Sequence, residues 1–434
     1  MILFFIFIFL GLVFSLLYVF GREKFSPANL LLAVWLVSIG IAQLRLSPYE
    51  KPWTAGFWLI LLLFFVLFYF SYRVIGKIID RKTKGKTADG NKSQPINAKV
   101  FLVVALVLTV SSLLSNLYIY LHFGTMPIFS SLPDKMRFII NKDIFGLFEY
   151  IALLPRLYTP LLFFYVLSAD KMSFKYKFFV WFNIILGFGL LLLYASRLVI
   201  ILPILLSYFI YLYLRKRELN FKKIIISSLV VLMVVGSISV AIPAFRNYIT
   251  YKDYYAETPD YTPFTYLADI SGINMPAGLD WLVPLYLIPS FNLQTMMQAT
   301  DFYGPGANSH YWGGYYVSVF NPLLKIFHLP ISDVVIPWKP IFLYWWITAT
   351  FLFPAWADFG YVGVILISLF WGAVLSLAYQ YASKKPTYLS VMLMAYLSFV
   401  VIMSIYADYL LRPEFYMDMF FILITGLIFF KFKD

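Results

Sequence analysis

The stretch Leu190-Leu-Leu-Leu-Tyr-Ala-Ser-Arg197 connects two apolar runs, residues 178–194 and 198–214, through a short turn. Each run is close to the roughly 20 apolar residues that an α-helix needs to cross the hydrocarbon core of a bilayer. The stretch therefore predicts a helical hairpin in a membrane, with the guanidinium of Arg197 at its tip. A permanent cation at this depth faces a water-filled cavity or an anionic partner, or its side chain extends to the lipid headgroups. Both interpretations of Arg197 remain open at this point.

The composition extends this prediction to the whole chain. Of the 434 residues, 62% are hydrophobic and only 13% are charged, which is far from the composition of soluble domains. The fold class expected is an all-α polytopic membrane protein with about 11 transmembrane helices. We expect the spans at residues 2–20, 28–44, 55–75, 98–120, 146–168, 178–194, 198–214, 224–243, 360–382, 389–407 and 414–431.

The formal net charge of +13 is an orientation signal. Lys and Arg are concentrated in loops such as 76–97 and 215–223, and basic loops face the cytoplasm. This rule places the N-terminus outside and the C-terminus inside, and it excludes nucleic acid as the partner. Residues 1–20 lack a basic segment before the apolar run, so we interpret them as a first span rather than a cleavable signal. The absence of cysteine excludes thiol catalysis and Cys-ligated metals.

The predicted spans divide the chain into three parts. Residues 1–243 form an N-terminal transmembrane bundle of about eight spans that includes the cytoplasmic basic loop 76–97, and residues 346–434 form a C-terminal part of about three spans. Residues 244–345 make one long extracytoplasmic loop. Long loops without structure are uncommon and are usually functional. We therefore expect a small helical cap over the membrane domain.

Three arginines are candidates for binding a diphosphate. Arg246 follows the eighth span, so it and Arg197 should both lie at the outer membrane surface. Guanidiniums offer permanently charged, bidentate donors to phosphate oxygens, although lipid headgroups are phosphates too. Arg156 lies between Pro155 and Pro160 inside an apolar run, where proline loosens the backbone hydrogen bonding. It either faces the same cavity or forms a structural ion pair with Glu149 or another buried acid.

Candidates for acid–base catalysis lie in the long loop. His310 and Asp301 could activate a hydroxyl acceptor as general bases, but a packed or capping role fits His310 equally well. Asp358 precedes two glycines that allow close helix approach, so a structural role, capping or pairing with a cation, is favoured for it. Tyr248 is a candidate for orienting the substrate or for a structural role. No Asp-x-Asp pair, HExxH motif or P-loop occurs, so no metal and no other cofactor is expected.

At this point the chain resembles the oligosaccharide repeat-unit polymerases, the Wzy-type or O-antigen polymerase family. The resemblance covers the hairpin with Ala195-Ser196-Arg197, the post-span Arg246, the long outer loop, and the Asp358-Phe-Gly-Tyr-Val-Gly363 entry into a late span. These motifs are short, and the match lies mainly in the architecture.

The resemblance implies a multi-span glycosyltransferase of the cytoplasmic (inner) membrane, with its active site on the extracytoplasmic side. A glycan on polyprenyl (undecaprenyl) diphosphate would be transferred to a hydroxyl of the next lipid-linked repeat unit, building a surface polysaccharide. The partners implied are the lipid-linked donor and acceptor, the bilayer, a flippase and a chain-length regulator. The family pattern supports Arg197 and Arg246 as diphosphate contacts. A metal-independent mechanism fits, because preorganised cations stabilise the charge on the departing diphosphate.

Two alternatives remain. A related O-antigen-type ligase would move the finished glycan from polyprenyl diphosphate to another acceptor. A flippase or transporter of lipid-linked oligosaccharide, which is not an enzyme, often shows internally related halves. No such halves are visible in this sequence, and the long loop occurs only once, which favours an enzyme.

Overall fold

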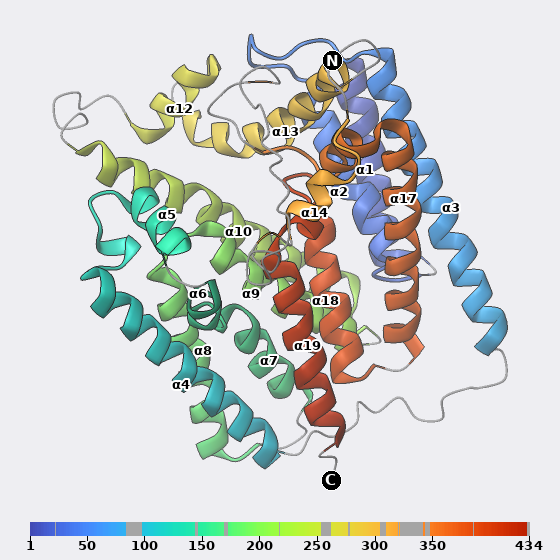
Figure 1. Cartoon of the computed structure of the whole chain (residues 1–434). Coiled ribbons are helices and arrows are strands. Elements are labelled where there is room, and N and C mark those ends of the chain that lie inside the picture. The colour runs from blue at the N-terminus through green and yellow to red at the C-terminus, as the bar shows by residue number, and fades with distance from the viewer. Residues whose placement is uncertain are drawn as a thin grey trace.

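The computed structural model describes residues 1–21, 23–83, 98–143, 146–168, 172–216, 218–252, 262–276, 278–303, 310–319, 321, 342, 348–384 and 386–431. Most of the predicted basic loop 76–97 and parts of the predicted cap therefore lie outside the described residues. Within the described residues, all regular structure is helical (Figure 1). The all-α class predicted from the sequence is confirmed.

A helix occurs at the position of each predicted span, and eight of these segments are long and apolar enough to cross a membrane. The chain is thus a polytopic helical membrane protein. The eight are built from α1 (Ile2–Phe20), α3 (Ala55–Thr83), α4 (Ala98–Phe123), α6 (Gly146–Ala152) with α7 (Pro155–Ser168), α8 (Phe174–Leu192), α9 (Arg197–Leu214), α10 (Phe221–Thr250) and α17 (Leu352–Lys384).

The remaining predicted spans correspond to α2 (Pro27–Ala42), α18 (Tyr388–Met403) and α19 (Pro413–Lys431). The first two are apolar but shorter than the roughly 20 residues of a full crossing. The count of 11 spans therefore remains a prediction. Proline explains a second difference, because Pro155 begins α7 and the expected single helix over 146–168 is split there into α6 and α7.

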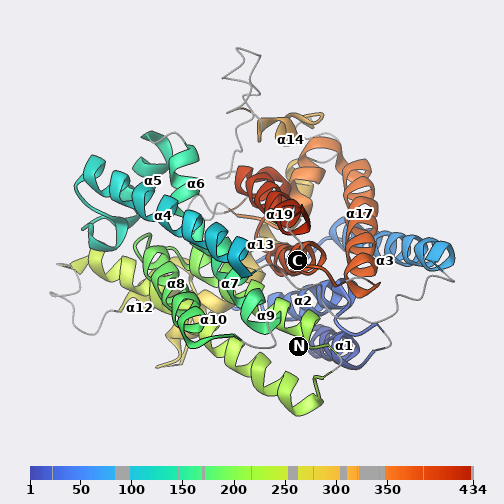
Figure 2. The same cartoon turned by 90° about the horizontal axis from the view of Figure 1, so that it is seen from below.

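The helices are arranged in two groups with α19 between them. Viewed from below, α4, α5 (Pro133–Asp143), α6 and α8 lie on one side, and α3 and α17 lie on the opposite side (Figure 2). The close packing of α3 against α17 depends on Gly372, because a Cβ there would lie 2.4 Å from the Phe68 carbonyl oxygen. A larger residue at this position would force the two helices apart.

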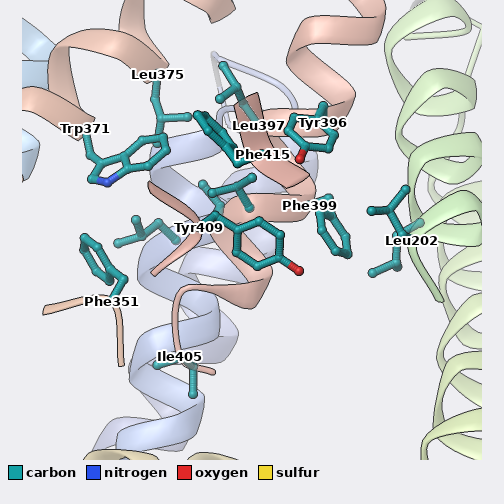
Figure 3. Close-up of a cluster of buried hydrophobic side chains, with 14 of the residues drawn as sticks. Leu202, Phe351, Trp371, Leu375, Tyr396, Leu397, Phe399, Ile405, Tyr409 and Phe415 are labelled. Carbon is teal, nitrogen blue, oxygen red and sulfur yellow. The ribbon is translucent and has the colours of Figure 1, made fainter. Parts of the chain in front are cut away.

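An apolar core joins the groups. Tyr409, from the 3-10 turn η3 (Tyr409–Leu411), lies between the side chains of Phe351 and Trp371 on one side and those of Phe399 and Leu202 on the other (Figure 3). The rings of Tyr409 and Phe399 meet edge to face with their centroids 5.4 Å apart. By contrast, α1 and α10 expose most of their apolar side chains, as helices that face lipid do.

The stretch 244–345 contains α12 (Pro263–Ser271), α13 (Val283–Phe302) and the short α14 (Gly314–Ser318), and α10 extends into it as far as Thr250. The apolar runs of this stretch, such as residues 281–288, are short, but α13 is a 20-residue helix that packs against α2, α10 and α17. Its buried positions include the polar residues Ser290, Asn292, Gln294 and Thr295, which interrupt the apolar pattern. Helices in this stretch are thus present, while the extracytoplasmic placement of the cap remains a prediction.

Candidate functional site

The predicted helical hairpin is present, and its turn is sharp. Ala195 adopts a positive φ of 47°, and Arg197 is the first residue of α9. The guanidinium carbon of Arg197 lies 5.9 Å from the centre of the Tyr406 ring, in a cation–π arrangement. The turn therefore directs this cation toward the segment between α18 and α19, and the protein itself supplies a contact for it.

Two further guanidiniums lie beside Arg197. Arg246 on α10 and Arg137 on α5 share the carboxylate of Asp134, at nitrogen–oxygen distances of 2.6 and 3.4 Å. Arg137 also donates to the hydroxyl of Ser196 in the hairpin turn, at 3.4 Å. The positive charges of Arg137 and Arg197 both act on Arg246. We call Arg137, Arg197 and Arg246 the arginine group.

A cavity of about 160 Å³ adjoins the arginine group and shares Arg137 with it. Its walls come from α5, α6, α7, α9, the hairpin turn, η3 and α19. The lining residues are Arg137, Ile140, Glu149, Leu153, Arg156, Tyr194, Ser196, Leu198, Val199, Leu202, Tyr409, Arg412, Glu414 and Asp418. This volume is smaller than the roughly 300–1,000 Å³ of pockets that enclose whole drug-sized ligands. It suits a headgroup-sized portion of a larger molecule.

Arg156 lines this cavity, and its charge is paired. Its Nη2 lies 2.8 Å from Asp418 Oδ1, and both side chains are almost fully buried. Tyr396 and Tyr150 also donate to the Asp418 carboxylate, at 2.9 and 3.1 Å. The sequence left open a cavity-facing cation or an ion pair with Glu149 or another acid. In the structure Arg156 lines a cavity whose lining does not include Arg197, and its ion-pair partner is Asp418.

Several buried polar atoms around the cavity have no hydrogen-bond partner within the described part of the chain. They are Nε of Arg156, Nε of Arg246 and the hydroxyls of Tyr194 and Tyr409. An unsatisfied buried donor costs about 1–3 kcal/mol. All four can donate to an oxygen-rich ligand. A phosphate-containing headgroup would supply acceptors for such donors.

The cavity carries both signs of charge. Three of its lining side chains are arginines and three are carboxylates. Among the described residues, Arg197 and Arg412 make no ion pair within 4.0 Å, so their charges are not neutralised by a bonded carboxylate. The Arg412 guanidinium lies 5.5 Å from the centre of the Tyr409 ring. Arginine held over aromatic rings keeps its planar donors available to an anion.

Asp358 lies on α17 and does not line the cavity. Its carboxylate lies at the start of α14. Its two carboxylate oxygens accept the backbone N–H groups of Tyr315 and Tyr316, at 3.0 and 3.2 Å. Gly360 has a φ of 58°, and a Cβ there would lie 3.0 Å from Nε2 of His310. Close helix approach was predicted at these glycines, but Gly360 instead makes a kink in α17 and leaves room for the His310 ring.

The predicted bases are not brought to the cavity. His310 Nδ1 lies 3.3 Å from the Ala357 carbonyl oxygen, and its ring packs near Tyr303. Asp301 is exposed in the last turn of α13, and Tyr248 is about half exposed on α10. None of the three side chains lines the cavity. Their predicted catalytic and orienting roles therefore gain no geometric support.

Asp408 connects α14 with the cavity wall. It precedes Tyr409, and its carboxylate accepts the hydroxyl of Tyr316 at 3.0 Å and the backbone N–H of Leu410 at 2.9 Å. Burial raises the pKa of Asp408 from 3.8 to about 7. Asp358 and Asp408 thus both accept hydrogen bonds from α14. Because Asp408 precedes Tyr409, these bonds connect the long loop to the cavity wall that contains Tyr409.

Sequence reasoning missed four of the six charged residues that line the cavity. Arg137, Arg412, Glu414 and Asp418 were not selected as site residues. A usable signal was present, because Asp418 lies inside an apolar run, where an acid is expensive unless it is paired. Arg156 and Asp418 are 262 positions apart, so the pattern could not pair them.

No group of three or more His, Asp or Glu side chains that could hold a metal ion is found in the part of the chain that the structure describes. The fold and the cavity define the class: a polytopic helical membrane protein with an arginine-rich cavity where several helices meet. No family model, no curated protein and no solved structure matches the chain, so comparison with known proteins does not identify a family within this class.

Proposed function

We propose that the protein is a membrane glycosyltransferase that joins polyprenyl-diphosphate-linked oligosaccharide repeat units into a surface polysaccharide. The observation that carries this proposal is the convergence of five guanidiniums on one cavity and its rim. Arg156, Arg137 and Arg412 line the cavity, and Arg197 and Arg246 lie beside Arg137. Cations gathered in this way suit a ligand with several phosphate oxygens.

The size of the cavity supports a lipid-linked ligand. A space of about 160 Å³ accepts a diphosphate and the group next to it, but not an oligosaccharide. The sugars would extend beyond the cavity, and the polyprenyl chain would run along apolar helix surfaces such as those of α10. This division of the ligand explains why a charged cavity lies among helices of strongly apolar composition.

The chemistry follows from the positions of the cations. As the bond from the sugar to the diphosphate breaks, negative charge grows on the departing oxygen. Fixed guanidiniums stabilise this charge more than they stabilise the bound substrate, and such donors contribute about 3–4 kcal/mol each in known enzymes. The arginine group is fixed in this way, because Asp134 and Ser196 hold Arg137 and Tyr406 contacts Arg197.

The proposal is tested in cells by Arg197→Ala and Arg246→Ala. Each variant is expected to insert at the wild-type level and to abolish polymerisation, which leaves single repeat units on the acceptor. Arg73→Ala is the matched control, because Arg73 lies on α3, outside the cavity lining, and pairs with Glu23 at 2.7 Å. Wild-type glycan lengths in both test variants would refute the proposal. Long unattached chains would indicate a ligase, and units trapped on the inner leaflet would indicate a flippase.

A further inference from the structure

The turn before α14 holds an aromatic residue on a strained backbone. Trp312 has a φ of 51°, in the left-handed region, where a bulky residue is an outlier. Gly313 follows with a φ of 92°, a conformation that glycine adopts without strain. Such strain persists only where the surrounding structure enforces it, and strained residues cluster at ligand-binding and active sites. The conformation of Trp312 therefore makes this residue a candidate for function.

The kinked start of α17 enforces this conformation. The backbone N–H groups of Tyr311 and Trp312 donate to the carbonyl oxygens of Ala357 and Asp358, at 3.1 and 3.0 Å. The Asp358 carboxylate in turn accepts two backbone N–H groups of α14, so the turn is held on both sides. The backbone of Trp312 is thus fixed in the folded protein, and its side chain leaves the turn in a defined direction.

The side chain of this fixed residue is exposed. Trp312 is 78% exposed, and its ring meets the ring of Phe359 edge to face with the centroids 6.5 Å apart. Tryptophans at a membrane interface are exposed too, but that role needs no strained backbone. Trp281, in η2 (Asp280–Leu282), is 45% exposed, and its φ is not positive. Exposure at an interface therefore does not account for the backbone of Trp312.

A sugar is the ligand that suits a fixed, exposed indole ring. The face of an aromatic ring carries partial negative charge. The C–H groups on one side of a pyranose ring carry partial positive charge and form a flat apolar surface. Stacking therefore removes apolar area of both partners from water, while the hydroxyls of the sugar stay solvated. A ring whose backbone is already fixed also loses less conformational freedom when the sugar binds.

The position of the turn relative to the cavity supports a glycan as the ligand. Tyr316, four positions after Trp312, donates to Asp408, which precedes Tyr409 of the cavity wall. Four residues span at most about 14 Å, so the backbone of Trp312 lies near this contact. In addition, α14 packs against η3, which contributes Tyr409 to the cavity. Sugars that extend out of the cavity past η3 would therefore meet the Trp312 ring.

We propose that Trp312 is a stacking platform for a sugar of the lipid-linked glycan, an inference that rests on the proposed function and extends its site. The arginines in and beside the cavity hold the diphosphate, and the glycan runs past η3 to the indole ring. Trp312 thus contributes to the binding of the sugars but not to the binding of the lipid diphosphate. It selects substrates by their glycan and takes no part in the chemical step.

The test compares two ligands that differ only in the glycan. The purified full chain in nanodiscs is titrated with the lipid-linked repeat unit, extracted from cells that lack the protein, and with undecaprenyl diphosphate. Trp312→Ala should weaken binding of the repeat unit by about 10-fold, because removing a tryptophan from an interface commonly costs that much or more. Its affinity for undecaprenyl diphosphate should stay within about 2-fold of the wild type. Trp312→Phe keeps a ring face and should lose less than Trp312→Ala.

Two further variants serve as controls. Trp281→Ala also removes an exposed tryptophan, and it should leave the affinities for both ligands unchanged. Trp312→Gly guards against a folding defect, because glycine relieves the strained φ. This variant should resist unfolding by SDS at least as well as the wild type, and it should still bind the repeat unit about 10-fold more weakly.

Three results would contradict these expectations. Equal affinity of the wild type and Trp312→Ala for the repeat unit would overturn the proposal. In that case, quenching of the Trp312 fluorescence by brominated lipids would identify the ring as a membrane anchor. An equal loss of both ligands in Trp312→Ala and Trp312→Gly would also overturn the proposal, because the ring would then support the structure of the whole site. A wild type that binds neither ligand would instead overturn the proposed function.

Discussion

The buried pair of Arg156 and Asp418 gives the sharpest prediction for stability. Asp418→Asn keeps the size of the side chain but removes its charge, which leaves the Arg156 guanidinium buried without a counter-charge. The pair lies at 2.8 Å with both side chains less than 10% exposed. Apart from the cavity that both side chains line, the pair has little contact with water, so the substitution should act on the folded state directly.

The expected magnitude follows from this burial. Removing one partner of a buried ion pair costs about 3–5 kcal/mol. The Tyr396 and Tyr150 hydroxyls donate to different oxygens of Asp418, so the single amide oxygen keeps an acceptor for only one of them and the other adds to this cost. Arg156→Met with Asp418→Leu removes both charges, and its loss should be smaller than that of either single change.

The assay is the free energy of unfolding by SDS titration in mixed micelles. Glu218→Gln serves as the control, since its exposed pair with Arg215 should contribute only about 0–1 kcal/mol. A loss below about 1 kcal/mol in Asp418→Asn, or single and double changes that simply add, would refute the view of these residues as one buried unit.

Two further predictions concern the segment around α14. Gly360→Ala should lower the free energy of unfolding by about 1–3 kcal/mol, because φ of 58° and ψ of −135° are tolerated almost only by glycine, and an unchanged SDS titration would contradict this. The pKa of Asp408 is raised from 3.8 to about 7, so the folded state holds its proton more tightly than the unfolded state. The contribution of Asp408 to stability should therefore be fully present below pH 4 and fall as the pH rises to about 7, by up to about 1.4 kcal/mol per pH unit. The difference between the wild type and Asp408→Asn should follow this fall in SDS titrations at several pH values, and a pH-independent difference would count against it.

The positions of the helices could be predicted from the sequence because apolar runs of the required length are a strong signal. The hairpin before Arg197 is such a case, and the helices α8 and α9 fall where the runs predict them. The pattern of apolar runs did not predict α13 as a long helix, because the buried face of this helix contains polar residues such as Asn292 and Gln294. It also failed at Pro155, where one predicted span became two helices.

Of the residues at the candidate site, the sequence predicted three arginines but none of the acids that pair with them. Arg156, Arg197 and Arg246 stood out because charges next to apolar spans are rare and expensive. The acids that pair with Arg156 and Arg246, Asp418 and Asp134, lie on other helices, and sequence spacing says nothing about such contacts. His310 was attractive by its chemistry alone, whereas the structure packs its ring against Gly360 and the Ala357 carbonyl.

The central claim is that the arginine group binds the diphosphate of a lipid-linked glycan. The most direct measurement is the affinity of the purified protein for farnesyl diphosphate, with farnesol as the uncharged comparison. Each of Arg137→Ala, Arg197→Ala and Arg246→Ala should weaken diphosphate binding by roughly 10- to 100-fold, because a hydrogen bond to a charged group contributes about 1.5–3 kcal/mol. Farnesol binding should be the same in all variants. Equal affinity of the wild type and the variants for farnesyl diphosphate would contradict the claim.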